Sequence, residues 1–432
     1  MDTSIRFLRR TVQTRTLRRH AGATTDGIPT NGTVRRAALT SALRKGSRRA
    51  AVASGCVLAL AGSALGATPT QADDRQITAA DQAYFSYYHL DAAREKGYTG
   101  KGVTVALIDG KVDTSVPELA GANIIDKTPC TVNSSSEHTN HGTGIASLLV
   151  SRDYGVVPDA TLLSYQSHDS SSTVEHDCQL AAKIPLIGLP SLINHAINDG
   201  ASIISFSASS REHENNLKWA IARAMSQGVI ITAAAGNAGK DENDTSLSWW
   251  SGVVGVSAID DKGKFASYSS WGQGVTTAAV GGPFVERLIS DGKIGTTQGT
   301  SYSAPIVAGA LAQARAKWPN ATANQLLQLL VNTAVGHENG WNQYGGYGAA
   351  NLGGMLNTDP TQYPDENPLA DKGGGTSPTP AEVQQYADGL VDPTEIAYDN
   401  SYAYRGLDES QVTNKDNTYP IHLGTSPRFH RK

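Results

Sequence analysis

The chain has 432 residues, of which 39% are hydrophobic and 18% are charged, a balance typical of a folded globular protein. The formal net charge is −4 at pH 7, so overall charge gives no support for a nucleic-acid-binding or membrane-surface protein. The length fits one large domain or two of medium size.

The N-terminal part of the chain has the order of features found in export signals. The first 50 residues contain four arginine pairs and only two acids, and an uncharged, largely apolar stretch follows from Ala50 to Ala67. A basic region, a short apolar region and a small-residue end are typical of a cleavable signal, whose last residue would be Ala67 or Ala72. We therefore expect residues 1–72 to form a basic leader and export signal, and the mature protein to be secreted and extracellular.

Several alternatives concern this leader. The apolar stretch is short and rich in Ala and Gly, which disfavours an uncleaved membrane anchor. The segment before Val34 is long for a signal peptide, so residues 1–33 could lie upstream of the true translation start. Cys56 follows Ser54-Gly55 as in lipid-modified signals, but the apolar run continues beyond it instead of ending there. A transit peptide is disfavoured because it needs no apolar region behind its basic part.

Residues 73–356 have the pattern of an α/β domain. Five short, almost continuously apolar runs are typical of strands buried on both faces: 103–108, 160–164, 203–207, 229–235 and 253–259. Stretches with helical spacing lie between or after them, at 189–198, 214–227 and 325–334. Strands that alternate with helices predict a mostly parallel central sheet with helices on both faces, a three-layer α/β fold.

Residues 357–432 differ in composition from the domain before them. They are rich in Pro, Asp, Asn, Gly and Tyr and contain Gly373-Gly374-Gly375 and Pro378-Thr379-Pro380. Such a composition favours a flexible or loosely packed tail. Because every candidate catalytic motif precedes it, we expect the tail to be dispensable for hydrolysis of small peptides.

Two cysteines remain once a leader containing Cys56 is removed. Cys130 and Cys178 are an even count in an oxidising compartment, where cysteines are usually paired. We expect one disulfide between them; two unpaired, buried thiols are the alternative.

Two apolar runs end at a polar side chain. The run 103–108 delivers Asp109, and the run 229–235 is followed by Gly236 and Asn237. Functional groups gather beyond the carboxyl ends of parallel strands, and a side-chain amide there could donate to an oxyanion. Taken alone, either residue is equally well explained as an ordinary turn residue.

A histidine and a serine stand at the start of helical patterns. His141 lies in Asn-His-Gly-Thr-Gly before an apolar helical run, and Ser301 lies in Gly-Thr-Ser-Tyr-Ser-Ala-Pro before another. Free N–H groups and the helix dipole favour developing negative charge at a helix N-terminus. Taken alone, His141 is equally well explained as a surface histidine, and Ser301 as a simple helix-capping serine.

The combination of motifs resembles the subtilisin family, the subtilases, in which the catalytic residues follow in the order Asp, His, Ser. The Asn-His-Gly-Thr and Gly-Thr-Ser-Tyr-Ser-Ala-Pro segments carry the resemblance. Ala235-Gly236-Asn237 is similar to the family's oxyanion segment, and 203–207 is similar to its substrate-pairing strand. Residues 345–351 look like its closing segment. The similarity extends from about Leu90 to Leu356 and implies a subtilisin-like fold.

The resemblance also implies an activity and a set of roles. The chain would be a serine endopeptidase that cleaves proteins or peptides through an acyl-enzyme. We expect it to act as a monomer, with no nucleic-acid partner and no stable membrane anchor after signal cleavage. Asp109, His141 and Ser301 would form the catalytic triad, and Asn237 would be an oxyanion donor. Substrate would add as an extended strand along Ser205, Phe206 and Ser207.

Several positions depart from the family pattern. Asp109 is followed by Gly110-Lys111 where a hydroxyl residue and a glycine are usual, and Gly144 replaces the usual histidine of His-Gly-Thr-His. Ser207 replaces a glycine of the substrate strand, and residues 73–100 are too short for the usual prodomain. These departures keep a second hypothesis open, a catalytically silent subtilase-fold protein that binds peptides.

No cofactor is expected for the chemistry itself. No His and Cys set has the spacing of a zinc site. The acidic residues Asp241, Glu242 and Asp244 could favour a basic substrate side chain or hold calcium as a structural ion, although a solvated loop explains them more simply.

Overall fold

The computed structural model describes residues 75–168, 172–178, 185–207, 215–242, 246–406 and 422–423. The predicted leader, residues 1–72, lies outside the described residues. Within the part of the chain that is described, no helix is long and apolar enough to cross a membrane.

A seven-stranded sheet forms the centre of the fold, and every pair of neighbouring strands in it is parallel. In sheet order the strands are β2 (Ile124–Asp126), β4 (Thr161–Gln166), β1 (Thr104–Asp109), β6 (Ile203–Phe206), β7 (Ile230–Ala234), β8 (Val253–Ile259) and β9 (Val275–Val280). The five predicted apolar strands are all present, and all of them lie in this sheet. The apolar runs form strands because both faces of a parallel sheet are covered.

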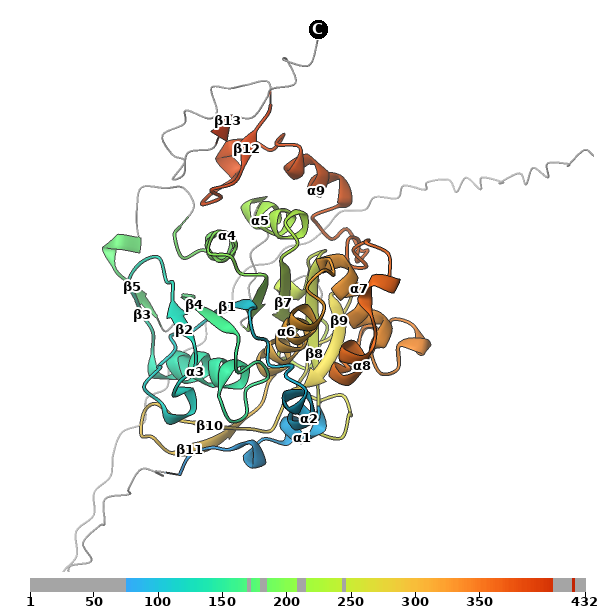
Figure 1. The fold of residues 1–432 in the computed structure, drawn as a ribbon. Coiled ribbons are helices and arrows are strands. Elements are labelled where there is room, and N and C mark those ends of the chain that lie inside the picture. Colours follow the sequence, from blue (N-terminus) through green and yellow to red (C-terminus); the bar gives the residue numbers. More distant parts are fainter. Residues whose placement is uncertain are drawn as a thin grey trace, which may run out of the picture. The chain divides into compact units, whose positions relative to one another are not determined.

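Helices cover both faces of the sheet (Figure 1). One face packs against α3 (Ser136–Val150) and α6 (Thr300–Lys317), and the other against α4 (Leu189–Asn198) and α5 (Asn215–Ser226). Alternate strand residues divide between the two cores: Val105 and Leu107 belong to the α3–α6 core, whereas Ala106 and Ile108 belong to the α4–α5 core. The predicted three-layer α/β fold is confirmed.

Further elements complete the domain. Helices α7 (Ala323–Thr333) and α8 (Leu352–Asn357) follow α6, and an antiparallel hairpin of β10 (Phe284–Arg287) and β11 (Ile294–Thr297) precedes it. A small antiparallel pair, β3 (Val132–Asn133) and β5 (Thr173–Val174), lies near Cys130 and Cys178 in sequence. These two cysteines are placed as a disulfide pair, with their Cα atoms 5.2 Å apart.

The segment from residue 75 to 98 is built into the α/β domain. It forms η1 (Ala79–Asp81), α1 (Ala83–Tyr87) and α2 (Leu90–Glu95). Ile77 and Tyr84 are buried in the α3–α6 core, and the Tyr84 hydroxyl donates to the Tyr154 carbonyl at 2.8 Å. This part of the chain therefore belongs to the domain and is not a separate prodomain.

The structure differs from the predicted loose tail. Helix α9 (Pro380–Ala387), η7 (Pro393–Glu395) and β12 (Ala403–Tyr404), which pairs with β13 (His422–Leu423), follow the domain. Apolar residues of this segment pack on α5 in one buried cluster: Trp219 and Ala222 of α5 with Tyr386, Val391, Ile396, Tyr402 and Tyr404. Over its described part the tail is packed, and the sequence did not indicate this because its apolar residues are spaced singly and form no periodic run.

Polar contacts fix the same interface. Arg223 of α5 pairs with Asp399 at 3.2 Å, and both side chains are almost completely buried. The Asn194 and Asn198 side chains of α4 donate to the backbone carbonyls of Ala397 and Tyr398. Removing one partner of a buried pair of this kind destabilises a protein strongly, so we expect truncation of the tail to lower the stability of the domain. That the tail is dispensable for hydrolysis of small peptides stays a prediction.

We predict that Trp219→Phe lowers the free energy of unfolding by about 1–3 kcal/mol, because it removes the indole N–H that donates to Glu395. Thermal unfolding should show a melting temperature lower by several degrees. Lys293→Gln is a control, because Lys293 pairs with Asp291 at 2.7 Å through largely exposed side chains away from α5, and its loss should cost only about 0–1 kcal/mol. Equal melting temperatures for Trp219→Phe and the wild type would contradict the packing of the tail on α5.

Candidate active site

Asp109 ends β1, a central strand of the sheet, and its side chain is 1% exposed. One carboxylate oxygen, Oδ1, accepts from the backbone N–H of Gly110 at 2.6 Å and from His141 Nδ1 at 2.7 Å. The position is the one predicted for it, the carboxyl edge of a parallel sheet.

The sequence predicted His141 at the start of a helix. In the structure it lies in the second turn of α3, because this helix begins at Ser136, five residues before His141. Ser135 caps the helix by accepting from the His138 backbone N–H at 3.1 Å. Two glycines allow α3 to lie close to the chain segment that directly follows β1. A Cβ atom at Gly110 would lie 1.9 Å from the His138 carbonyl oxygen, and one at Gly142 would lie 2.4 Å from the Gly110 carbonyl oxygen. This close approach brings the imidazole to Asp109.

The charge state of His141 is set by opposing effects. Burial alone would lower the pKa of the imidazole, but the charge of Asp109, the hydrogen bond to Asp109 and the charge of Glu286 outweigh burial and raise it. The side chain keeps 31% of its surface exposed, so it can reach a bound ligand. A histidine whose Nδ1 proton is held by a carboxylate is suited to act as a general base once the pH exceeds its raised pKa.

The second carboxylate oxygen of Asp109, Oδ2, is buried and has no hydrogen-bond partner among the described residues. The family usually places a hydroxyl residue directly after this aspartate, where this chain has Gly110. A hydroxyl side chain does not fit at position 110 in this structure, because a Cβ atom there would lie 1.9 Å from the His138 carbonyl oxygen. Lys111, the cation that the sequence places nearby, has an exposed side chain.

Ser301 and Asn237 lie around one point at the start of α6. Ser301 is the second residue of the helix and is 7% exposed. A Cβ atom on the preceding Gly299 would lie 3.0 Å from Ser301 Oγ and 3.1 Å from Asn237 Nδ2, so both atoms border the same small space. A side chain at position 299 would press on both atoms, whereas glycine leaves the space between them free.

The Asn237 amide is oriented by Thr300. Its Oδ1 accepts from the Thr300 backbone N–H at 2.8 Å and from Thr300 Oγ1 at 3.0 Å, and Thr300 Oγ1 accepts in turn from the Gly236 N–H. With Oδ1 held in this way, Nδ2 is directed toward the space beside Ser301. His141 approaches the same helix, since its ring centroid lies 5.7 Å from that of Tyr302.

The structure does not support substrate pairing along Ser205 and Phe206. Both residues lie inside the sheet, where they pair with Leu107 and Ile108 of β1 and with Thr232 and Ala233 of β7. An interior strand has no free edge to offer a peptide. Ser207 follows the end of β6 and is buried, and residues 208–214 lie outside the described residues.

The acidic cluster is only partly described. Glu242 accepts from Ser270 Oγ at 2.5 Å and lies 3.8 Å from Lys240 Nζ, while Asp244 lies outside the described residues. Among the residues that the structure describes, the one set of ligand atoms close enough for a metal ion is Cys130, Asp177 and Cys178. Its two sulfur atoms are already paired with each other, so this set does not fit a metal ion.

Sequence reasoning missed Glu286 and Tyr302. Glu286 stands in the β10 strand, half-buried beside the active-site helix, and accepts from the Tyr302 hydroxyl. Nothing local in Phe-Val-Glu-Arg marks it as a site residue. The one available signal was Gly144, where the usual histidine is absent, and the space above Gly144 is occupied by these two side chains.

Comparisons with known proteins show the family of this chain. The model of the subtilase family, Peptidase_S8, matches residues 100–348. Subtilisin E of Bacillus subtilis (strain 168) is 28% identical over 255 residues, which cover 56% of this chain and 63% of that protein. The thermostable alkaline protease of Halalkalibacterium halodurans is 29% identical over 258 residues, covering 58% of this chain and 67% of that protein. The chain thus spans less than two thirds of the subtilisin's length.

A solved structure shows the same fold. The crystal structure of MycP1 from Mycobacterium smegmatis superposes with a TM-score of 0.55 at 24% identity, covering 71% of this chain and 90% of that chain. At this level of identity the similarity concerns the fold alone.

Proposed function

This chain belongs to the subtilase family, and we propose that it is a subtilisin-type serine endopeptidase with Asp109, His141 and Ser301 as its catalytic triad. The observation that carries the proposal is the Asp109–His141 hydrogen bond of 2.7 Å. Ser301 is the second residue of α6, and the next residue, Tyr302, has its ring centroid 5.7 Å from that of His141. The chemistry follows from the residue types and their order along the chain.

The first half of the reaction would form an acyl-enzyme. Because Nδ1 of His141 donates to Asp109, Nε2 is the free base that takes the proton of Ser301 Oγ. The serine oxygen then attacks the peptide carbonyl. The Ser301 backbone N–H and Asn237 Nδ2 donate to the resulting oxyanion. The protonated His141 gives its proton to the leaving amine, and the carbon–nitrogen bond breaks.

The second half would restore the enzyme. Water enters after the amine leaves, and His141 takes one of its protons while the oxygen attacks the ester carbon. Collapse of the second oxyanion breaks the bond to Ser301 Oγ, which regains a proton from His141. Throughout, Asp109 stabilises the imidazolium by charge and hydrogen bond without becoming protonated.

A catalytically silent peptide-binding protein is the second candidate. The buried Asp109 Oδ2 without a hydrogen-bond partner among the described residues favours it, since an uncompensated carboxylate oxygen weakens the support for His141. A fluorophosphonate probe separates the two candidates, because only an activated serine reacts with it. Labelling of the wild-type protein supports the peptidase; a folded protein that stays unlabelled contradicts it.

We propose the predicted leader as well, with residues 1–72 directing export and the mature protein acting as an extracellular monomer on protein or peptide substrates. Support comes from the order of basic, apolar and small residues at the N-terminus. Sequencing of the N-terminus of protein recovered from the culture medium tests the cleavage after Ala67 or Ala72.

In the exported protein we expect Cys130 and Cys178 to be oxidised to one disulfide. The short distance of 5.2 Å between the two Cα atoms supports this pairing, although the loop after β2 and η3 (His176–Cys178) are far apart along the chain. Thiol labelling of denatured, unreduced protein should find no free thiol, and labelling after reduction should find two. Two reactive thiols before reduction would contradict the pairing.

A further inference from the structure

A second carboxylate lies beside the candidate catalytic histidine, on an element that carries none of the triad residues. Glu286 of β10 accepts from the hydroxyl of Tyr302, the residue directly after Ser301. A Cβ atom at Gly144 would lie 2.7 Å from Glu286 Oε2 and 2.9 Å from the Tyr302 hydroxyl oxygen. Any side chain at position 144, including the usual histidine of the family, would therefore displace this pair.

Tyr302 connects the carboxylate to the active-site helix. The residue is 3% exposed, and its ring stacks on Phe284 at 4.8 Å and meets the His141 ring edge-on at 5.7 Å between centroids. Burial and the neighbouring Glu286 raise the pKa of the tyrosine hydroxyl well above its ordinary value, so the hydroxyl stays protonated and donates. Tyr302 thereby holds Glu286 in place next to His141 without adding a charge.

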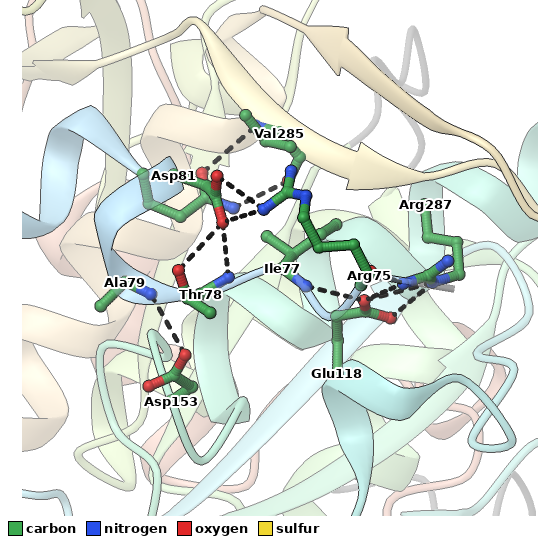
Figure 2. Close-up of polar contacts among 10 residues, drawn as sticks. Arg75, Ile77, Thr78, Ala79, Asp81, Glu118, Asp153, Val285 and Arg287 are labelled. Atoms are coloured by element: carbon green, nitrogen blue, oxygen red, sulfur yellow. Dashed lines mark hydrogen bonds and ion pairs between the residues drawn. The ribbon is translucent and has the colours of Figure 1, made fainter. Parts of the chain in front are cut away.

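The N-terminal segment and η2 (Pro117–Leu119) hold the strand that carries Glu286. The backbone of Val285 exchanges two hydrogen bonds with the Gln82 side chain, at 2.7 and 3.2 Å. Arg287, on the other side of Glu286, pairs with the buried Glu118 at 2.8 Å and donates to the Arg75 carbonyl at 2.7 Å (Figure 2). These contacts of Val285 and Arg287 hold the backbone in place on both sides of Glu286.

On the premise that the triad is the one proposed above, we propose that Glu286 is a positioning residue that places a negative charge beside His141. It thereby sets the pH at which His141 becomes a base. Among the described residues, the titratable groups that act on the imidazole are Asp109 from β1, Glu286 from β10 and the neutral Tyr302 from α6. In this arrangement Gly144 is functional, because it leaves the room that Glu286 and Tyr302 occupy.

The direction of the effect follows from the charges. A negative charge near His141 stabilises the imidazolium and raises its pKa, so a smaller fraction of the enzyme holds the neutral base at a given pH. Glu286→Gln removes the charge, while the amide oxygen of glutamine can still accept from Tyr302. The pKa of His141 should fall, and the acidic limb of kcat/KM should move to lower pH, by about 0.5 pH unit.

The experiment compares pH profiles of kcat/KM for the wild type, Glu286→Gln and the control Glu338→Gln, whose carboxylate is 67% exposed. One pH unit below the wild-type midpoint, Glu286→Gln should be about two- to threefold more active, whereas the control should follow the wild-type profile. An unchanged midpoint in folded Glu286→Gln, or an equal loss of activity at every pH, overturns the proposal.

A second measurement does not depend on turnover. NMR titration of the His141 ring in the Ser301→Ala protein, with and without Glu286→Gln, should show the same downward shift of its pKa. Equal titration curves overturn the inference even if peptides are cleaved. If instead Ser301→Ala alone retains full activity, the proposed triad fails while the titration still reports on Glu286. Should Glu286→Gln not fold, Tyr302→Phe replaces it and should give a smaller shift in the same direction.

Discussion

Ser301→Ala is expected to lower kcat by about 10⁶-fold, the size of effect measured for the nucleophile of a subtilisin. The change removes the only atom that can form the acyl-enzyme in the proposed mechanism. It leaves His141 and Asp109 without a proton to move. Ser301 Oγ borders the open space beside Gly299, so its removal should disturb little packing. Turnover of a chromogenic peptide, together with fluorophosphonate labelling, measures the effect, and both should be lost while the melting temperature stays close to the wild-type value.

Ser303→Ala is the matched control, two residues further along the same helix. Its hydroxyl is fully buried and donates to the backbone carbonyls of Ala279 and Val280 at 3.1 and 3.2 Å. These contacts give it a structural role, so its removal should cost stability and leave the chemical step in place. Activity that survives Ser301→Ala and disappears with Ser303→Ala would show that the nucleophile has been assigned to the wrong serine.

The central sheet could be predicted because its strands are buried on both faces. In β1 every residue from Val105 to Ile108 faces one of two apolar cores, which leaves an unbroken apolar run in the sequence. The polar residues directly behind such runs, Asp109 and Asn237, were then expected at one edge. Their neighbours Gly110 and Gly236 are close-approach positions, which explains why small residues surround each motif.

Other features could not be predicted because their contacts join segments far apart in sequence. Trp219 of α5 and Tyr386 of α9 belong to one buried cluster, yet no sequence pattern around either residue predicts the other as its partner. Ser205 and Phe206 looked like a strand available to substrate, but only the strand order shows that β6 has neighbours on both sides. The position of Glu286 beside the candidate site could not be predicted for the same reason, since it depends on Gly144 and Tyr302 from two other elements.

The second large effect is expected at Asn237. Asn237→Ala should lower kcat by about 10²–10³, corresponding to about 2.7–4 kcal/mol, the range measured for the oxyanion-hole asparagine of a subtilisin. KM should change much less, because the negatively charged oxygen exists only as the carbonyl becomes tetrahedral. Steady-state kinetics on one peptide across the substrate range separates the two constants.

Asn237→Asp makes the test specific for the donated hydrogen bond. The side-chain oxygen that accepts from the Thr300 N–H at 2.8 Å and from Thr300 Oγ1 at 3.0 Å is present in both residues, so aspartate can keep the contacts that orient the side chain. Only the Nδ2 donor is replaced, by an oxygen that carries negative charge toward the developing oxyanion. The loss in kcat should therefore equal or exceed that of Asn237→Ala, while the melting temperature should be closer to the wild type. A rise in KM with unchanged kcat in both variants would instead make Asn237 a substrate-binding residue, and the oxyanion would have to be stabilised by backbone N–H groups at the start of α6.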